Sequence, residues 1–237
     1  SLQDADRMIE AQQRTGRKLG VIFQTRYTKS VERLKALIDA GYFGRILSAR
    51  SYLTWNRPHT YYEGSDWKGT WDREGGGVLI DQAIHSMDRV RYMLGSDIEW
   101  IEGSVHNHCH DTVRVEDAAE AAIQFKNGCI YNLYACNSYA SDAPITIEFQ
   151  GEKGRCGLIQ DMGFYEADGC YTEIRNTYET TSVGPDYWGS SHHLQLRDFY
   201  DSILYDRPVA IDAMEGRKTL ELSLIHISEP TRRVVIS

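Results

Sequence analysis

Three consecutive glycines, Gly75 to Gly77, directly precede an apolar segment with helical periodicity, and this junction constrains the fold more than any other stretch. The apolar residues of 79–94 recur at three- and four-residue intervals, which predicts a helix that ends at Gly95. Asp81 and His85 are four residues apart, so a helix would place both side chains on one face.

A carboxylate close to an imidazole is a common way to build a general base near neutral pH, which makes Asp81 and His85 the predicted catalytic residues. The glycines would let the backbone approach a group that a Cβ would block. On these two residues alone a structural alternative stays open. In it, Asp81 favours the helix N-terminus and His85 is a satisfied, partly buried histidine.

The glycine run does not have the pattern of a dinucleotide-binding loop. That pattern is G-x-G-x-x-G after an apolar strand, whereas here Ile80 stands at the third glycine position and the polar, aromatic segment 67–74 precedes the run. We therefore interpret it as a loop of a functional site. The loops around it supply predicted substrate-binding residues that can stack on or hydrogen-bond to a polar ring: Trp55, Arg57, Tyr61, Trp71 and, at the start of a late helix, His193.

The remaining patterns predict an α+β fold with a mostly antiparallel, open sheet and flanking helices. Residues 160–189 are polar and irregular, consistent with a mobile or ligand-covering loop, and the late helix from Ser191 is expected to turn Ile203 and Leu204 inward. The predicted helices cover 2–15, 30–40, 79–94 and the segment from 191, and the predicted strands cover 19–23, 46–54, 98–105, 118–125, 130–138 and 145–149.

Three histidines at alternate positions, His106, His108 and His110, suggest a metal site on a strand. Alternate strand residues lie about 7 Å apart, which is wide for three ligands of one ion, and no fourth ligand is evident. An exposed polar strand face is the favoured interpretation, and we predict no metal. No G-x-S-x-G, H-E-x-x-H or Walker A motif occurs either.

Charge and cysteine usage limit the partners and the compartment. The net charge of −8 argues against nucleic acid or an anionic membrane as the main partner. No apolar run approaches the ~18 residues of a membrane span, and the N-terminus does not resemble a signal peptide. The five cysteines show no C-x-x-C spacing, which favours reduced thiols in a cytoplasmic protein.

The order of these motifs resembles the Gfo/Idh/MocA family of sugar and inositol dehydrogenases over residues 1–222. The matching segments are S-L-Q-D-A-D-R-M-I, G-V-I-F-Q-x-R-Y, L-K-A-L-I-D-A-G-Y-F-G-R-I, G-G-G-V-L-I-D-Q-A-I-H-S-M-D, V-R-V-E-D-A-A, F-K-N-G and H-x-Q-x-R-D-F. The resemblance implies hydride transfer between NAD or NADP and a secondary hydroxyl of a sugar, sugar derivative or cyclitol. His85 would be the acid/base, and Asp81 would orient or electrostatically support it.

The resemblance also implies a domain division and a homo-oligomer that forms through the open sheet. Residues 1–27 would be the last helix and strand of a truncated Rossmann domain, and 28–222 the substrate and oligomerisation domain. The tail 223–237 departs from the family and looks like translated sequencing-adapter sequence, which leaves open that it is an artefact and would make it poorly packed.

The family's dinucleotide-binding glycines and its Glu-Lys-Pro motif have no counterpart in this sequence, so the cofactor-binding residues are unknown. We therefore expect these residues alone neither to bind a nicotinamide cofactor tightly nor to turn over. Two alternatives to a dehydrogenase remain: a non-catalytic sugar-binding or dimerisation module, and an NAD-dependent glycosidase on the same fold.

Overall fold

The computed structural model of the chain describes residues 1–111, 113–176, 191–224 and 234–235. Within these ranges, nine strands form one sheet in the order β8-β7-β6-β5-β1-β4-β3-β2-β9. The strands are β1 (Ile46–Thr54), β2 (Ile98–His106), β3 (Ala118–Phe125), β4 (Ile130–Cys136), β5 (Thr146–Gly151), β6 (Gly154–Ile159), β7 (Met162–Ala167), β8 (Cys170–Ile174) and β9 (Val234–Val235).

Every neighbouring pair of strands is antiparallel except β1 and β4, which run parallel. The predicted α+β class with a mostly antiparallel open sheet is confirmed. The helices are α1 (Leu2–Thr15), a 3₁₀ turn η1 (Gln24–Tyr27), α2 (Lys29–Asp39), α3 (His59–Glu63), a π-helical turn η2 (Leu79–Ala83), α4 (Ile84–Leu94), α5 (His192–Leu204) and α6 (Ala213–Ser223).

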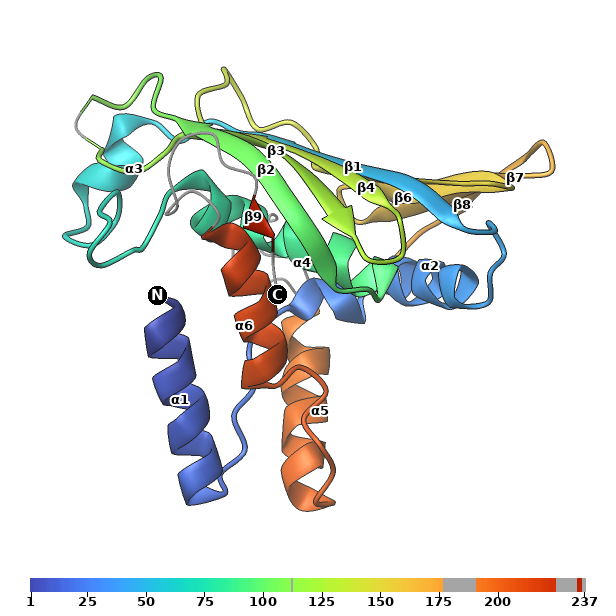
Figure 1. Ribbon diagram of the computed structural model, residues 1–237, viewed down its shortest axis with the longest axis horizontal. Helices are drawn as coiled ribbons and strands as arrows, with labels where there is room; N and C mark the ends of the chain where they lie inside the picture. The colour runs from blue at the N-terminus through green and yellow to red at the C-terminus, as the bar shows by residue number, and fades with distance from the viewer. Residues whose placement is uncertain (112, 177–190, 225–233, 236–237) are drawn as a thin grey trace.

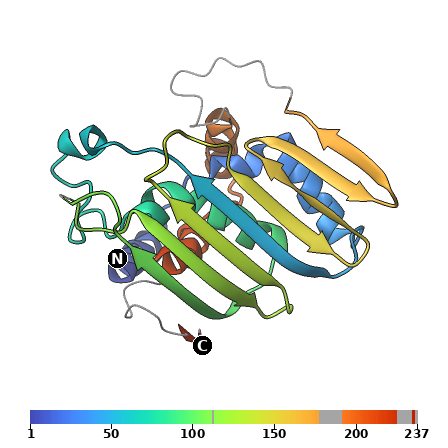
Figure 2. The same cartoon turned by 90° about the horizontal axis from the view of Figure 1, so that it is seen from above.

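The helices gather on one side of the sheet. α2 and α4 lie beneath it, and α1, α5 and α6 extend away from it (Figure 1). Viewed from above, the opposite face of the sheet is covered by none of the described helices (Figure 2). An antiparallel sheet with one packed face and one open face alternates buried and exposed side chains, which is the pattern that the sequence shows.

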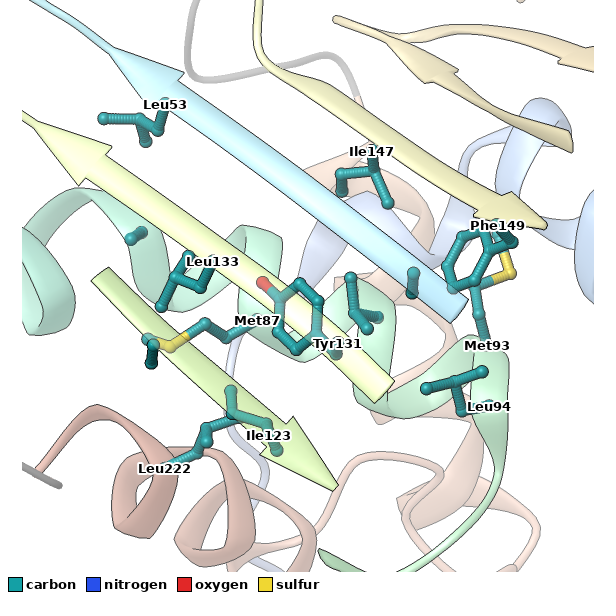
Figure 3. Close-up of a cluster of buried hydrophobic side chains, with 14 of the residues drawn as sticks. Leu53, Met87, Met93, Leu94, Ile123, Tyr131, Leu133, Ile147, Phe149 and Leu222 are labelled. Atoms are coloured by element: carbon teal, nitrogen blue, oxygen red, sulfur yellow. The ribbon is translucent and has the colours of Figure 1, made fainter. Parts of the chain in front are cut away.

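The core lies between the sheet and α4. Met87 and Met93 of α4 meet Tyr131 of β4 and Phe149 of β5, and all four side chains are fully buried (Figure 3). Burial of each such side chain stabilises the fold by about 1.5–3 kcal/mol. The Tyr131 hydroxyl keeps a partner inside the core, since it lies 2.6 Å from the Ser51 hydroxyl.

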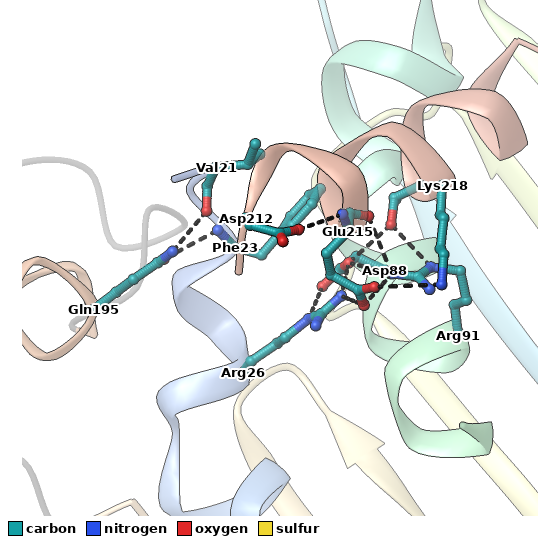
Figure 4. Close-up of polar contacts among 10 residues, drawn as sticks. Val21, Phe23, Arg26, Asp88, Arg91, Gln195, Asp212, Glu215 and Lys218 are labelled. Carbon is teal, nitrogen blue, oxygen red and sulfur yellow. Dashed lines mark hydrogen bonds and ion pairs between the residues drawn. The ribbon is translucent and has the colours of Figure 1, made fainter. Parts of the chain in front are cut away.

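A buried ionic cluster joins the helical layer. The Arg26 guanidinium donates to the Asp88 carboxylate from Nε at 2.7 Å, and it reaches Glu215 at 3.0 Å (Figure 4). The Thr219 hydroxyl donates to the same Asp88 carboxylate at 2.9 Å, and Arg91 pairs with Glu215. The cluster therefore fixes η1, α4 and α6 relative to one another, directly after the predicted catalytic residues.

The predicted strand over 19–23 is wrong, although helix α1 before it is confirmed. Only a single bridge between Gly20 and Asp212 forms there. The backbone of this segment finds other partners: the Phe23 amide donates to Gln195 Oε1 at 3.0 Å, and Gln195 Nε2 donates to the Val21 carbonyl at 2.6 Å. A side chain of α5 thus satisfies groups that a neighbouring strand would otherwise satisfy.

Two further expectations fail in the second half of the chain. Residues 162–174 are not irregular: they form the β7–β8 hairpin, whose turn residues Asp168 and Gly169 have φ of 52° and 73°. Ile203 and Leu204 do not point inward, since they are 48% and 73% exposed. Residues 177–190 of the expected loop lie outside the described residues.

The proposed foreign tail is described only in part. Ser223 ends α6 and is buried with Leu224, so these two residues belong to the packed structure. Residues 225–233 lie outside the described residues. None of the described helices combines the length and hydrophobicity needed to cross a lipid bilayer. All five cysteines are free thiols.

Candidate functional site

A cavity of about 470 Å³ opens where η2, the N-terminal turn of α4 and the 55–68 loop meet. A volume of this size suits a small polar ligand such as one sugar ring. It is lined by Ile22, Gln24, Trp55, Arg57, Tyr61, Lys68, Asp81, Gln82, His85 and His192. Both predicted catalytic residues and three of the five predicted substrate-binding residues therefore meet at one cavity.

The glycine run positions this site by close backbone packing. The Val78 amide donates to the Glu116 carbonyl at 3.0 Å, and the Leu79 amide donates to the Glu116 carboxylate at 3.2 Å. A Cβ on Gly77 would lie 1.9 Å from the Glu116 carbonyl oxygen. The group whose close approach requires a glycine at position 77 is thus the backbone of Glu116.

The helix begins with a π turn, η2, in place of a regular α-helical turn. Such turns are wider than an α-helical turn and are frequent at functional sites. In this turn Asp81 and Gln82 both reach the cavity, while His85 follows in the first α-helical turn of α4.

Asp81 is held by neutral donors. The Tyr61 hydroxyl donates to Asp81 Oδ2 at 2.8 Å, and the Gln82 amide donates to the same oxygen. Asn137 in turn donates to the Gln82 side-chain oxygen at 2.8 Å, which fixes Gln82. Burial, and next the Asp81 charge, raise the pKa of Tyr61 well above its ordinary value, so Tyr61 is a hydrogen-bond donor at all relevant pH values.

His85 lies at the cavity with its ring edge-on to Phe23, at a centroid distance of 5.8 Å. Its Nδ1 atom is buried and has no hydrogen-bond partner among the described residues. Burial, and next the positive charge of Arg89, lower the pKa of His85 to about 4, whereas the charges of Asp88 and Asp81 act in the opposite direction. His85 is therefore a neutral imidazole at pH 7.

No hydrogen bond joins Asp81 to His85, although both are described residues and both line the cavity. Asp81 consequently acts on the imidazole through its charge, and not by holding the ring in place. Of the two forms of support that the sequence suggested, the electrostatic one fits this geometry.

The aromatic wall of the cavity is fixed by the backbone around it. The Trp55 indole donates to the Ala143 carbonyl at 3.0 Å, and the Arg57 guanidinium lies 4.6 Å from the Trp55 ring. Arg57 also pairs with Asp142 at 3.2 Å. These contacts present a rigid indole and a fixed cation to the cavity, which are groups that stack on and hydrogen-bond to sugars.

A buried histidine holds this wall from behind. His110 Nδ1 lies 3.0 Å from the Asp117 carboxylate, and His110 Nε2 lies 2.6 Å from the Arg57 carbonyl oxygen. These two contacts hold the His110 ring between Asp117 and the backbone of Arg57, the residue that reaches the cavity.

The three alternate histidines do not share one strand face. β2 ends at His106, which stacks on the exposed His108 at 5.1 Å, while His110 is buried beyond the strand. The predicted exposed face is therefore wrong for His110. Within the described residues no group of three or more His, Cys, Asp or Glu side chains is arranged to hold a metal ion.

Two predicted substrate-binding residues lie away from the cavity. Trp71 lines a separate depression near Ser1 and donates from its indole to the Arg114 carbonyl at 2.7 Å. His193 is exposed on α5, whereas its neighbour His192 reaches the cavity. Lys68 and Gln82 also line the cavity without having been predicted. The only signal in the sequence that could have placed them at the site was their position next to Trp67 and Asp81.

The residues present do not fit the pyrophosphate of a dinucleotide. The sequence has no G-x-G-x-x-G pattern. The space at the last glycine of its one glycine run is taken by the Glu116 carbonyl, so no phosphate can sit there.

Comparisons with known proteins concern the family and the fold of the chain. The model of the GFO/IDH/MocA C-terminal domain matches residues 31–156. Myo-inositol 2-dehydrogenase of Thermotoga maritima is 24% identical over 94% of this chain and 65% of its own length. The scyllo-inositol 2-dehydrogenase (NAD(+)) of Bacillus subtilis is 26% identical over 94% of this chain and 64% of its own length. The chain thus spans less than two thirds of the length of these curated relatives.

Solved structures share the fold across the whole chain. The WlbA dehydrogenase of Bordetella pertussis, in complex with NADH and UDP-GlcNAcA, superposes with a TM-score of 0.80 at 22% identity, over 100% of this chain and 69% of that one. The aldose-aldose oxidoreductase of Caulobacter crescentus, complexed with glycerol, gives a TM-score of 0.82 at 18% identity, again over 100% and 69%.

Proposed function

The chain belongs to the Gfo/Idh/MocA family, and from this premise we propose that it forms the substrate-binding part of an NAD(P)-dependent oxidoreductase. The substrate would be a sugar, sugar derivative or cyclitol, oxidised at a secondary hydroxyl. The observation that carries the proposal is His85: a neutral imidazole at a sugar-sized cavity that also holds the Asp81 carboxylate. The activities of the two inositol 2-dehydrogenases among the relatives support it.

In this function His85 is the proton acceptor. A neutral imidazole accepts a hydrogen bond from the substrate hydroxyl and then takes its proton as the carbon is oxidised. With a pKa of about 4 the free ring is a weak base. The Asp81 charge stabilises the imidazolium that forms, and this stabilisation grows once substrate excludes water from the cavity.

The remaining cavity residues hold the ring of the substrate. Trp55 supplies a flat apolar surface, Arg57 and Tyr61 supply polar groups, and Asp81 accepts from hydroxyls of the sugar. NAD or NADP would supply the hydride acceptor. Since the present residues do not fit its pyrophosphate, we assign none of them to it, and we expect residues 1–237 alone to show neither micromolar NADH binding nor turnover.

We also propose that the protein is a homo-oligomer that associates through the open face of the sheet. Tyr52 and Tyr134 are register partners on β1 and β4, and they alternate with buried neighbours, so they share this face. Partly exposed aromatic side chains on an uncovered sheet face favour a protein partner over solvent.

The test of the proposed function joins this chain to the nicotinamide-binding domain of a relative and follows NADH formation with polyol substrates. We expect His85→Ala to lower kcat by about 10²–10⁴-fold with a small change in KM. The matched control is His108→Ala, an exposed histidine distant from the cavity residues in sequence. Sugar binding without turnover in the unaltered fusion would favour a non-catalytic module, and an unchanged rate in His85→Ala would refute the role of His85 as proton acceptor. Release of a hydrolysed glycoside would favour the glycosidase.

A further inference from the structure

The ring of Tyr61 is in contact with two cations at the cavity. The Lys68 ammonium lies 3.6 Å from the ring centroid, and the Arg57 guanidinium carbon lies 5.4 Å from it. Both cations and the ring line the same cavity as His85. Each contact is a favourable cation–π interaction, but two positive charges next to one ring also repel each other.

None of the negative charges nearby pairs directly with Lys68. Arg57 pairs with Asp142, and Asp81 accepts hydrogen bonds from the Tyr61 hydroxyl and the Gln82 amide. Glu74 acts on Lys68 through its charge, but burial raises the pKa of Glu74 to about 7, so this carboxyl is only partly ionised at neutral pH. Among the described residues, no carboxylate oxygen lies within 4.0 Å of the Lys68 ammonium, which instead contacts the aromatic faces of Tyr61 and Trp67.

We propose that Lys68, with Arg57 beside it, binds an anionic group carried by the substrate, so that the natural substrate is an acidic sugar with a carboxylate or a phosphate. The inference rests on the proposed function and specifies its substrate class. An anion beside Lys68 forms a charge-assisted hydrogen bond and relieves the repulsion between the two cations. The Asp81 carboxylate repels the same anion. The opposite charges of Lys68 and Asp81 therefore also determine the orientation of the sugar in the cavity.

The test measures affinity in the 237-residue chain, with the emission of Trp55 in the cavity wall as the reporter. The ligands are glucose, glucuronate and glucose 6-phosphate, which differ in charge and in the source of that charge. We expect at least one of the two acidic sugars to bind about tenfold more tightly than glucose. The stronger of the two acidic sugars identifies the anionic group.

The variants assign this preference to one side chain. Lys68→Met should weaken binding of the acidic sugar about tenfold and leave glucose binding unchanged, and Lys68→Arg should restore most of the affinity. Lys153→Met is the control, because Lys153 is exposed at the β5–β6 turn. Urea denaturation of each variant confirms that the fold is retained.

Two outcomes contradict the inference in different ways. Equal affinity of the unaltered chain for glucose and the acidic sugars, or an equal loss for all three in Lys68→Met, would overturn the anion site and leave the proposed function standing. Failure of all three sugars to bind would refute sugar binding at this cavity, and the anion site with it.

Discussion

Asp81 and His85 line the same cavity, but they differ in the hydrogen bonds that hold their side chains. Asp81 is fixed by Tyr61 and Gln82, whereas His85 Nδ1 is buried and finds no partner in the part of the chain that the structure describes. A carboxylate that is not hydrogen-bonded to the imidazole raises its basicity only by charge, so the burial of His85 dominates and the ring stays neutral. This balance makes His85, the proposed proton acceptor, a measurable contributor to pH-dependent stability.

The first prediction concerns acid sensitivity. Because burial lowers the pKa of His85 from 6.5 to about 4, the unfolded chain binds more protons than the folded one between these values. The contribution to stability is complete above pH 6.5 and is lost as the pH falls towards 4. Between pH 7 and pH 4 the unaltered chain should lose about 1–3 kcal/mol more free energy of unfolding than His85→Asn does, measured by urea denaturation. His108→Asn should behave like the unaltered chain, and a parallel pH profile in His85→Asn would contradict the assignment.

The second prediction concerns the histidine that anchors the Arg57 backbone. His110→Phe removes one donor from the buried Asp117 carboxylate and one from the Arg57 carbonyl. We expect the free energy of unfolding to fall by about 3 kcal/mol, since each acceptor stays buried without that partner. His108→Phe replaces an exposed histidine two residues away and should change it by less than about 0.5 kcal/mol. Equal effects of the two changes would mean that the two contacts of His110 do not stabilise the fold.

The cavity residues that belong to recognisable sequence motifs were predicted, and those that only tertiary contacts bring to the cavity were missed. Asp81 and His85 follow from helical spacing, and Trp55, Arg57 and Tyr61 from one aromatic loop. Which residue of a helix or loop faces the cavity depends on the local course of the backbone. His192 therefore lines the cavity where its neighbour His193 was expected, and Lys68 lines it where Trp71, three residues later, was expected. That course is fixed by tertiary contacts such as the hydrogen bond from Trp71 to the Arg114 carbonyl.

At the scale of elements, the glycine run and the π turn act together to position Asp81 and Gln82. Gly77 packs its backbone on Glu116, the Leu79 amide donates to the Glu116 carboxylate, and the turn then directs Asp81 and Gln82 to the cavity. The Glu116 carboxylate is buried, and burial raises its pKa, with hydrogen bonds from the backbone acting against this effect. The loop before β3 therefore determines where the proposed catalytic turn begins.

The third prediction tests this packing. A Cβ at Gly77 would lie 1.9 Å from the Glu116 carbonyl oxygen, so Gly77→Ala must displace one backbone from the other. We expect it to lower the free energy of unfolding by about 3 kcal/mol and to weaken sugar binding, because the turn that carries Asp81 moves. Gly64→Ala is the control: an added Cβ there meets nothing within 4 Å, and φ is −85°. Gly77→Ala with the stability of Gly64→Ala would refute the close approach.

Local signals in the sequence explain which elements were predicted well. Helix α1 has Ser1 as its N-cap and a left-handed Gly16 at its end, and both are local features. The β7–β8 hairpin was also predictable, since Asp-Gly is a strong two-residue turn signal, but the surrounding polar residues obscured it. The apolar run at 19–23 misled because its hydrophobicity is local, whereas strand formation needs a neighbouring strand, and Gln195 takes that place.

At the scale of the whole molecule, the ionic cluster around Asp88 connects segments far apart in the chain. Asp88 is fully buried and accepts from Arg26 and Thr219, which belong to η1 and α6. A buried carboxylate with several donors is costly to disturb, even where an apolar replacement of the whole cluster would be neutral. The η1 turn and helix α6 are thereby held in a fixed position relative to α4 and the proposed catalytic turn.

The fourth prediction follows from this connection. Asp88→Asn leaves the Arg26 guanidinium buried with less compensation, and we expect a loss of about 3–5 kcal/mol in the free energy of unfolding. The control is Asp39→Asn, which breaks the exposed i,i+4 pair with Lys35 and should cost less than about 0.5 kcal/mol. Thermal unfolding followed by circular dichroism measures both. Similar losses in the two variants would show that the cluster contributes no more to the free energy of unfolding than a surface ion pair does.

The open face of the sheet leads to the last prediction. Tyr52 is 44% exposed on this face, beside the outward-facing Tyr134, and Tyr42 is 43% exposed after α2, on the helical side of the molecule. The two tyrosines are thus matched in size and exposure and differ in the face they occupy. If copies of the chain associate through the open face, Tyr52→Glu places a buried charge in the interface and should shift the sedimentation coefficient to that of the monomer. Tyr42→Glu should sediment like the unaltered chain, because its position stays in solvent in either state. A chain that sediments as a monomer before any substitution would show that this face is simply the solvated side of an antiparallel sheet, as such sheets permit.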